Sequence, residues 1–233
     1  MWNSDTRRLR SLLSTPDPIT WVLTGDSITH GLVHTQGARN YVDHLHELVR
    51  GDLGRSRDAM INTAISGWRT AQLLADFDQR VARWRPQIVT LMIGTNDCSS
   101  SGKVPLISAD DYAASLEDFV ARVRRLGAIP VLLTPPPVDE LHAPERARVP
   151  EFADAMRTVA RGQRVMLVDV FARFQERGRE RIDGIPWQLL ADPFHPNSTG
   201  HALIALQLAT TLGLARKDSD TLTRLRGIVG DRR

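Results

Sequence analysis

Three residues in the sequence are of the types used in covalent acyl transfer: Ser27, Asp192 and His195. A serine hydroxyl is a poor nucleophile at neutral pH unless an imidazole accepts its proton. The imidazole in turn needs a partner that fixes its tautomer and direction. Ser27 lies early in the chain, whereas Asp192 and His195 lie close together in the late segment Asp-Pro-Phe-His-Pro-Asn (192–197). One short loop can therefore deliver both the base and its orienting carboxylate, and the three residues together predict a serine nucleophile.

The segments between these residues predict the elements that position them. Short apolar segments, rich in β-branched residues and free of charge, are typical of strands covered on both faces; they are 19–24, 59–64, 88–93, 129–134 and 165–168. Longer amphipathic segments predict helices at 39–53, 70–84, 109–126, 150–161 and 198–214. Such alternation favours a parallel sheet between two layers of helices. We therefore predict an α/β fold, a three-layer α/β/α sandwich with a five-stranded parallel sheet.

The length of 233 residues and a hydrophobic content of 42% suit one domain with a sizeable core. We predict residues 1–215 to form this domain and residues 216–233 to form a C-terminal tail. The tail has few large apolar residues. It is either loosely held, or it adds one packed helical turn through Leu222, Leu225 and Ile228.

The charge, the hydropathy and the cysteine content exclude several classes of protein. The formal net charge is +3, and all of the 30 basic residues except Lys103 and Lys217 are arginines. These arginines are interleaved with acidic residues, so no nucleic-acid binding is predicted. There is no 20-residue apolar stretch and no apolar leader, so we expect a cytoplasmic protein without a membrane span. The lone Cys98 excludes an intramolecular disulfide and is expected to be buried.

Glycines and small polar residues follow several predicted strands, at the ends where parallel sheets bind their ligands. Ser27 follows the first strand, Ser66 and Gly67 follow the second, and Asn96 and Asp97 follow the third. Packing alone does not explain such residues at successive strand ends, so we expect them to meet in one site. Asp97 itself is interpreted as a structural partner for neighbouring backbone N–H groups.

Four short blocks contain these residues: Gly-Asp-Ser-Ile-Thr (25–29), Asn-Thr-Ala-Ile-Ser-Gly (62–67), Gly-Thr-Asn-Asp (94–97) and Asp-Pro-Phe-His-Pro (192–196). In this order they resemble the SGNH/GDSL hydrolase superfamily, the esterases and lipases of flavodoxin-like fold. The resemblance covers most of the chain, from about residue 19 to about residue 212. Two departures are Ala64, where many relatives have a glycine, and Ile-Thr after the serine. Neither departure changes a catalytic group.

The resemblance implies a role for each site residue. Ser27 would be the nucleophile, His195 the base and Asp192 the carboxylate that orients it. The backbone N–H groups of Ser27 and Gly67 and the side-chain amide of Asn96 would donate to the oxyanion. Glycine suits position 67 because a backbone donor must approach the reacting carbon without a side chain in between. No cofactor and no metal is implied, and the sequence contains no metal-binding motif.

Three further residues are candidates for the substrate pocket: Trp68, Trp187 and Pro136. Trp68 adjoins Gly67, and Pro136 lies in the proline-rich connection 134–150, which is a candidate pocket wall or lid. Packing explains the two tryptophans equally well.

We therefore predict a cofactor-free serine esterase that hydrolyses carboxylic esters through an acyl-enzyme intermediate. Because no long apolar insertion is present for a lipid tail, the acyl chain is predicted to be short or medium. The substrate would be a small-molecule or a carbohydrate ester. Carbohydrate O-acetyl esterase and thioesterase activities remain open, since the same groups can perform them. A catalytically inactive binding module is the alternative from another class, and a missing triad or donor residue would indicate it; none is missing.

Overall fold

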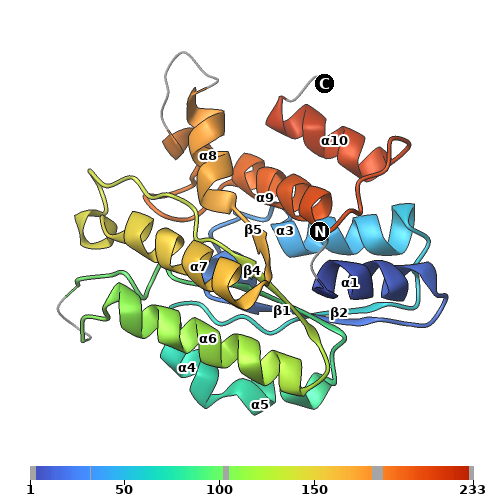
Figure 1. Cartoon of the computed structure of the whole chain (residues 1–233). Coiled ribbons are helices and arrows are strands. Elements are labelled where there is room, and N and C mark those ends of the chain that lie inside the picture. The colour runs from blue at the N-terminus through green and yellow to red at the C-terminus, as the bar shows by residue number, and fades with distance from the viewer. Residues whose placement is uncertain (1–3, 32, 102–104, 180–185, 231–233) are drawn as a thin grey trace.

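Five parallel strands form one sheet in the computed structural model, which describes residues 4–31, 33–101, 105–179 and 186–230 (Figure 1). The strands are β1 (Thr20–Gly25), β2 (Ala59–Asn62), β3 (Ile88–Met92), β4 (Ile129–Leu133) and β5 (Met166–Val168). Their order across the sheet is β2-β1-β3-β4-β5, and every neighbouring pair is parallel. The predicted α/β fold with a five-stranded parallel sheet is confirmed.

Both faces of the sheet are buried at β1, β3 and β4, which explains why these strands carry apolar residues without alternation, whereas the edge strand β2 is partly exposed. Trp21 and Leu23 of β1 point into one apolar core, and Val22 between them points into the other. Figure 1 shows α3, α9 and α10 above the sheet and α4, α5 and α6 below it. The three layers of the predicted sandwich are therefore helices, sheet and helices.

The helices of the first face differ most from the prediction. They are α1 (Ser4–Ser14), α3 (Tyr41–Glu47), α8 (Val170–Arg179), α9 (Ser198–Thr211) and α10 (Asp220–Val229). The sequence predicted neither α1 nor α8. The predicted helix at 39–53 begins after the N-cap Asn40 and changes into a π-helical turn at Leu48–Asp52.

On the second face lie α4 (Thr70–Ala75), α5 (Phe77–Arg80), α6 (Ala109–Arg125) and α7 (Val149–Gln163). The predicted helix at 70–84 is interrupted at Asp76, whose backbone leaves helical geometry and whose carboxylate binds Arg80. Short helical turns complete the chain at Ala82–Trp84, Pro144–Arg146 and Pro186–Leu189. None of the helices in the described residues is long and apolar enough to cross a membrane.

The segment after residue 215 forms a helix where it is described. Leu222 and Leu225 of α10 are buried against the core beside α9, and their exposed fraction is 1% each. Ile228, the third residue of the expected turn, is 42% exposed. Of the two alternatives for this tail, the packed helix is therefore present, with Val229 rather than Ile228 facing the core.

The position of β1 in the sheet determines where a site can form. Its neighbours are β2 on one side and β3 on the other, so the chain changes direction across the sheet at β1. In open parallel sheets, such a reversal leaves a crevice at the carboxyl ends of the strands. The segments that follow β1, β2 and β3 meet at this crevice.

Candidate active site

Ser27 lies at the carboxyl end of β1, in the first turn of α2 (Ser27–His30). Gly25 makes the turn with a φ of +150°, and a Cβ atom there would lie 1.9 Å from the carbonyl oxygen of Met92. Asp26 is the N-cap and accepts a hydrogen bond from the Ile28 N–H. Only glycine allows the chain to pass this close to β3 at position 25, and this close approach places Ser27 at the carboxyl edge of the sheet.

The side chains of Ser27, His195 and Asp192 form one hydrogen-bonded chain. Ser27 Oγ lies 2.8 Å from His195 Nε2, although 168 residues separate them in the sequence. On the other side of the ring, His195 Nδ1 lies 2.6 Å from Asp192 Oδ2. Serine and histidine are both buried, with 7% and 6% of their surface exposed. The structure brings together the three residues that the sequence predicted to converge.

The loop from Asp192 to His195 is held from several sides. The Asp192 carboxylate accepts the N–H groups of Phe194 and His195 at 3.0 and 2.8 Å, which closes the loop upon itself. Leu190 pairs with Pro196 in an antiparallel bridge across the base of the loop. Such a closed loop presents the imidazole in one direction with little freedom.

Asn197 fixes this loop to the helix that follows. Its side-chain oxygen accepts the N–H of Gly200 and caps α9, and its amide donates to the carbonyl groups of Gln188 and Leu190. One side chain therefore joins the start of α9 to the helical turn and the bridge residue that precede the loop.

Burial and hydrogen bonding shift the pKa values of the acid and the base. Burial of His195 penalises the imidazolium and lowers the pKa of the ring below 6.5, although Asp192 acts to raise it. Partial burial acts to raise the pKa of Asp192. The hydrogen bonds that its carboxylate accepts from Phe194 and His195 nevertheless hold that pKa below its usual value. A neutral imidazole beside an ionised carboxylate is the protonation state that a general base requires.

Three groups that the sequence predicted as oxyanion donors, on Ser27, Gly67 and Asn96, have N–H donors available for a ligand. Gly67 lies after β2 with a φ of +81°, is exposed, and has no atom within 4 Å of the place where a Cβ would be. The Asn96 amide donates to the carbonyl oxygen of Trp68 at 3.1 Å, which orients the side chain and leaves its second N–H available. The N–H of Ser27, as the first residue of a helix, has no partner within that helix.

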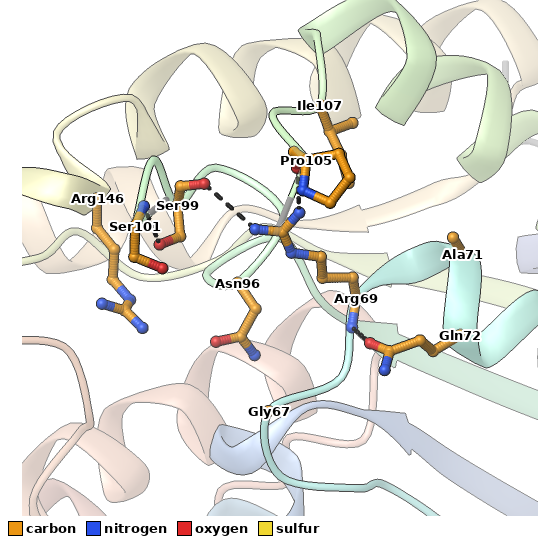
Figure 2. A pocket seen from close by; sticks show the side chains of 10 residues that line it. All are labelled: Gly67, Arg69, Ala71, Gln72, Asn96, Ser99, Ser101, Pro105, Ile107 and Arg146. Atoms are coloured by element: carbon orange, nitrogen blue, oxygen red, sulfur yellow. Dashed lines mark hydrogen bonds between the residues drawn. The ribbon is translucent and has the colours of Figure 1, made fainter. Parts of the chain in front are cut away.

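A cavity of about 520 Å³ opens beside Gly67 and Asn96 (Figure 2). Its remaining lining residues are Arg69, Ala71, Gln72, Ser99, Ser101, Pro105, Ile107 and Arg146. Arg146 comes from the 134–150 connection, part of which therefore forms a wall of this cavity. The volume is in the range of small-molecule binding pockets.

The profile of the GDSL-like lipase/acylhydrolase family matches residues 23–203, a range that includes Ser27, Gly67, Asn96, Asp192 and His195. The chain belongs to this family. It is 25% identical to an acetylxylan esterase from Geobacillus stearothermophilus over 203 residues, which cover 81% of this chain and 91% of the relative. The protein is accordingly a hydrolase of ester bonds.

Solved structures share the GDSL fold of this chain. An α/β hydrolase named LAE5, from the metagenome of Lake Arreo in Spain, aligns with a TM-score of 0.72 and 27% identity; the alignment covers 85% of this chain and 97% of that one. The acetylxylan esterase Axe2 from Geobacillus stearothermophilus aligns with a TM-score of 0.72 and 23% identity, with the same coverage of both chains. Together they show the three-layer architecture of SGNH/GDSL esterases.

The three residues that the sequence predicted as candidates for the substrate pocket lie in different environments. Trp68 is half-buried, carries the guanidinium of Arg80 5.3 Å above its ring, and orients Asn96 through its carbonyl group. Pro136 is buried. Neither residue lines the 520 Å³ cavity. The side chain of Trp187 lies outside the described residues.

His34 is a neighbour of the triad that the sequence did not predict as such. Its ring stacks on the His195 ring with centroids 3.4 Å apart and planes within 10°, and its Nδ1 lies 3.5 Å from Asp192 Oδ2. The residue follows the end of α2, where no periodic pattern predicts its direction. No signal in the sequence distinguished it from a solvent-facing histidine.

His34, Asp192 and His195 also place three metal-ligating atoms within 4.8 Å of one another. The two imidazole planes are parallel, however, so their nitrogen lone pairs run side by side instead of converging on one ion. Both nitrogens of His195 also contact Ser27 and Asp192. This geometry fits a base and its orienting group better than a metal centre.

Two buried carboxyl groups lie behind the site. Burial raises the pKa of Asp26 to about 7 and that of Asp97 to about 6. Asp97 accepts the N–H of Thr70, the first residue of α4, at 2.9 Å, which matches the structural role expected of it. Asp26 caps α2 with one oxygen, and its other oxygen has no hydrogen-bond partner among the described residues.

Proposed function

We propose that this protein hydrolyses carboxylic esters through a triad of Ser27, His195 and Asp192. The observation that supports this most directly is the continuous chain of short hydrogen bonds from Ser27 Oγ through both nitrogens of His195 to Asp192. In that arrangement the serine hydroxyl can donate to a neutral imidazole, and the carboxylate can stabilise the imidazolium that forms.

The reaction has two steps. Ser27 Oγ attacks the ester carbonyl while His195 accepts the hydroxyl proton, and the same histidine then gives this proton to the departing alcohol. This leaves an acyl group on Ser27. A water molecule, activated by His195, attacks the acyl-enzyme and releases the acid. Asp192 holds the imidazole in place throughout.

The oxyanion that forms in each step would be bound by the N–H groups of Ser27 and Gly67 and by the amide of Asn96. Gly67 provides an unobstructed backbone donor, and Asn96 is oriented in advance by the Trp68 carbonyl group. Removal of one donor of this kind typically lowers kcat by about 10²–10³-fold. These donors would therefore contribute a large part of the rate enhancement.

We infer that the acyl group is short and that the alcohol is a carbohydrate. The acetylxylan esterase from Geobacillus stearothermophilus, 25% identical over 81% of this chain, supports this choice. Structures of catalytic mutants of that enzyme carry alanine in place of a serine, an aspartate or a histidine, the three residue types proposed here.

A fluorophosphonate probe tests the nucleophile. We expect it to label the wild-type protein on Ser27 and to leave Ser27→Ala unlabelled, whereas Ser115→Ala, a change at a half-buried position of α6, should be labelled like the wild type. Mass spectrometry of the labelled peptide identifies the residue. Folded wild-type protein that is neither labelled nor active on any ester would instead identify a binding module.

A further inference from the structure

The cavity beside the oxyanion donors is positively charged. Its lining includes two arginines, Arg69 and Arg146, and no aspartate or glutamate (Figure 2). We propose that this cavity binds an ester that carries a carboxylate group, held by the two guanidinium groups next to Gly67 and Asn96. This inference rests on the proposed function, because it assigns a substrate class to the same site.

Arg146 lines the cavity and is held in place, with Glu145 as its ion-pair partner outside the cavity. Its guanidinium carbon lies 3.8 Å from the centre of the Phe194 ring, and that ring lies 4.4 Å from the ring of His195. Only 15% of the Arg146 side chain is exposed. The charge is therefore fixed close to the reacting atoms, in an environment where water screens it weakly.

The hydrogen-bonding capacity of Arg146 is only partly used. One terminal nitrogen pairs with Glu145, which does not line the cavity. The Nε atom is buried and has no hydrogen-bond partner among the described residues. A guanidinium presents its donors in a planar fork that matches a carboxylate, and the terminal nitrogen that does not pair with Glu145 is the donor that a ligand in the cavity can use.

Arg69 provides the second charge and stiffens the opposite wall. It donates to the carbonyl groups of Pro105 at 2.6 Å and Ser99 at 3.2 Å, which leaves further N–H donors on the same group. It forms no ion pair with a carboxylate among the described residues, and the buried Asp97 lies behind this wall without lining the cavity. The hydrogen-bond partners of the guanidinium are neutral carbonyl groups, and the Asp97 carboxyl group interacts with its charge without a hydrogen bond to it.

The two described aromatic rings next to Asn96 and His195, those of Trp68 and Phe194, each have an arginine over one face. Phe194 contacts Arg146 on one side and His195 on the other, and Trp68 has Arg80 over its ring. Cations therefore dominate recognition in the described part of the cleft. A cavity of about 520 Å³ is also much larger than an acetyl group, so the carboxylate can belong to the alcohol or to a longer acyl chain.

Matched ester pairs distinguish these two sources of the carboxylate. For the alcohol, we compare an acetylated methyl glucuronide with the corresponding acetylated methyl glucoside. For the acyl chain, we compare monomethyl glutarate with the methyl ester of glutaramic acid. In one of the two pairs we expect kcat/KM to be about 10- to 100-fold higher for the charged ester, which is the range of hydrogen bonds to charged groups.

Variants of Arg146 test the origin of that preference. Arg146→Met keeps an apolar contact with Phe194 and should lower the preference for charge, because only Arg69 then remains to bind the carboxylate, whereas Arg146→Lys should retain more of it. Arg125→Met, which removes an exposed arginine at the end of α6, is the control and should leave the preference unchanged. Added salt should lower kcat/KM for the charged ester and not for the neutral one.

Direct binding separates a failure of this inference from a failure of the proposed function. Calorimetry with Ser27→Ala measures the affinity for the intact charged and neutral esters without turnover. Tighter binding of a charged ester that is weakened in Ser27→Ala/Arg146→Met supports the inference even if the wild type proves inactive. Equal or tighter binding of the neutral esters in both pairs would overturn it, whatever the activity of the wild type.

Discussion

At the residue scale, the imidazole of His195 is constrained on every side that matters for proton transfer. Ser27 and Asp192 contact its two nitrogens, and His34 covers one face of the ring. Phe194 lies against the same ring at a tilt of 47°. Burial by these neighbours disfavours the charged form, so the histidine is a base that stays neutral to lower pH than a free imidazole.

The pH profile of kcat/KM tests this arrangement. In the proposed mechanism the neutral form of His195 is the base. Burial lowers the pKa of His195 below 6.5, so kcat/KM should rise with pH through a midpoint below 6.5 and stay level above it. In Asp192→Asn the partner that acts to raise this pKa is weakened. The midpoint should then fall further, and kcat should drop strongly. A midpoint above 6.5 in the wild type would contradict the assignment.

At the element scale, the site depends on how the loop after Leu190 is joined to α9. The helix begins at Ser198 because Asn197 caps it, and the same side chain holds the segment before the loop. Pro193 accepts the N–H of Asp139 at 2.7 Å, which ties the loop to the 134–150 connection. The base is thus positioned by backbone contacts from two segments far apart in the sequence.

Substitution of the cap should therefore affect both stability and catalysis. In Asn197→Ala we expect the free energy of unfolding to fall by about 0.5–2 kcal/mol, as for other lost N-caps. We also expect kcat/KM to fall about 10- to 100-fold, because a small displacement of the imidazole disturbs the reacting geometry. The control is Ser219→Ala, which removes the N-cap of α10 and should lower stability without changing kcat/KM. Equal kinetics for both variants would contradict a positioning role for Asn197.

At the scale of the whole molecule, two apolar cores on opposite faces of one sheet support the strands that border the crevice at β1. The first core includes α10, which packs against α9, the helix that follows the His195 loop. The carboxyl-terminal segment is therefore continuous with the core that supports the site. A few large apolar side chains of α10 determine how much this segment contributes to the free energy of unfolding.

Denaturant unfolding of two alanine variants measures this contribution. Leu225→Ala removes a buried side chain from α10 and should lower the free energy of unfolding by about 2–5 kcal/mol. Ile228→Ala, on the exposed side of the same helix, should change it by less than about 0.5 kcal/mol. Similar values for the two variants would mean that α10 does not pack on the core as described.

The strands, the fold class and the convergence of Ser27, Asp192 and His195 could be predicted from the sequence. Buried parallel strands are formed by uncharged segments rich in β-branched residues, so the local pattern indicates where they lie. The motifs that contain the site residues follow these strands directly, so their place at one edge of the sheet can also be predicted. Helices α1 and α8 escaped prediction because their short amphipathic segments are stabilised mainly by tertiary packing.

Tertiary structure alone decided which side chains from unrelated segments meet around the triad. His34 stacks on His195, and Arg146 stacks on Phe194, without any regular spacing in the sequence that relates one partner to the other. Such pairs form because loops from different strand ends are folded over the same crevice. The sequence by itself therefore determined the reacting groups and the sheet that carries them. The folded chain determined the surroundings that set the basicity of His195 and the charge of the cavity beside it.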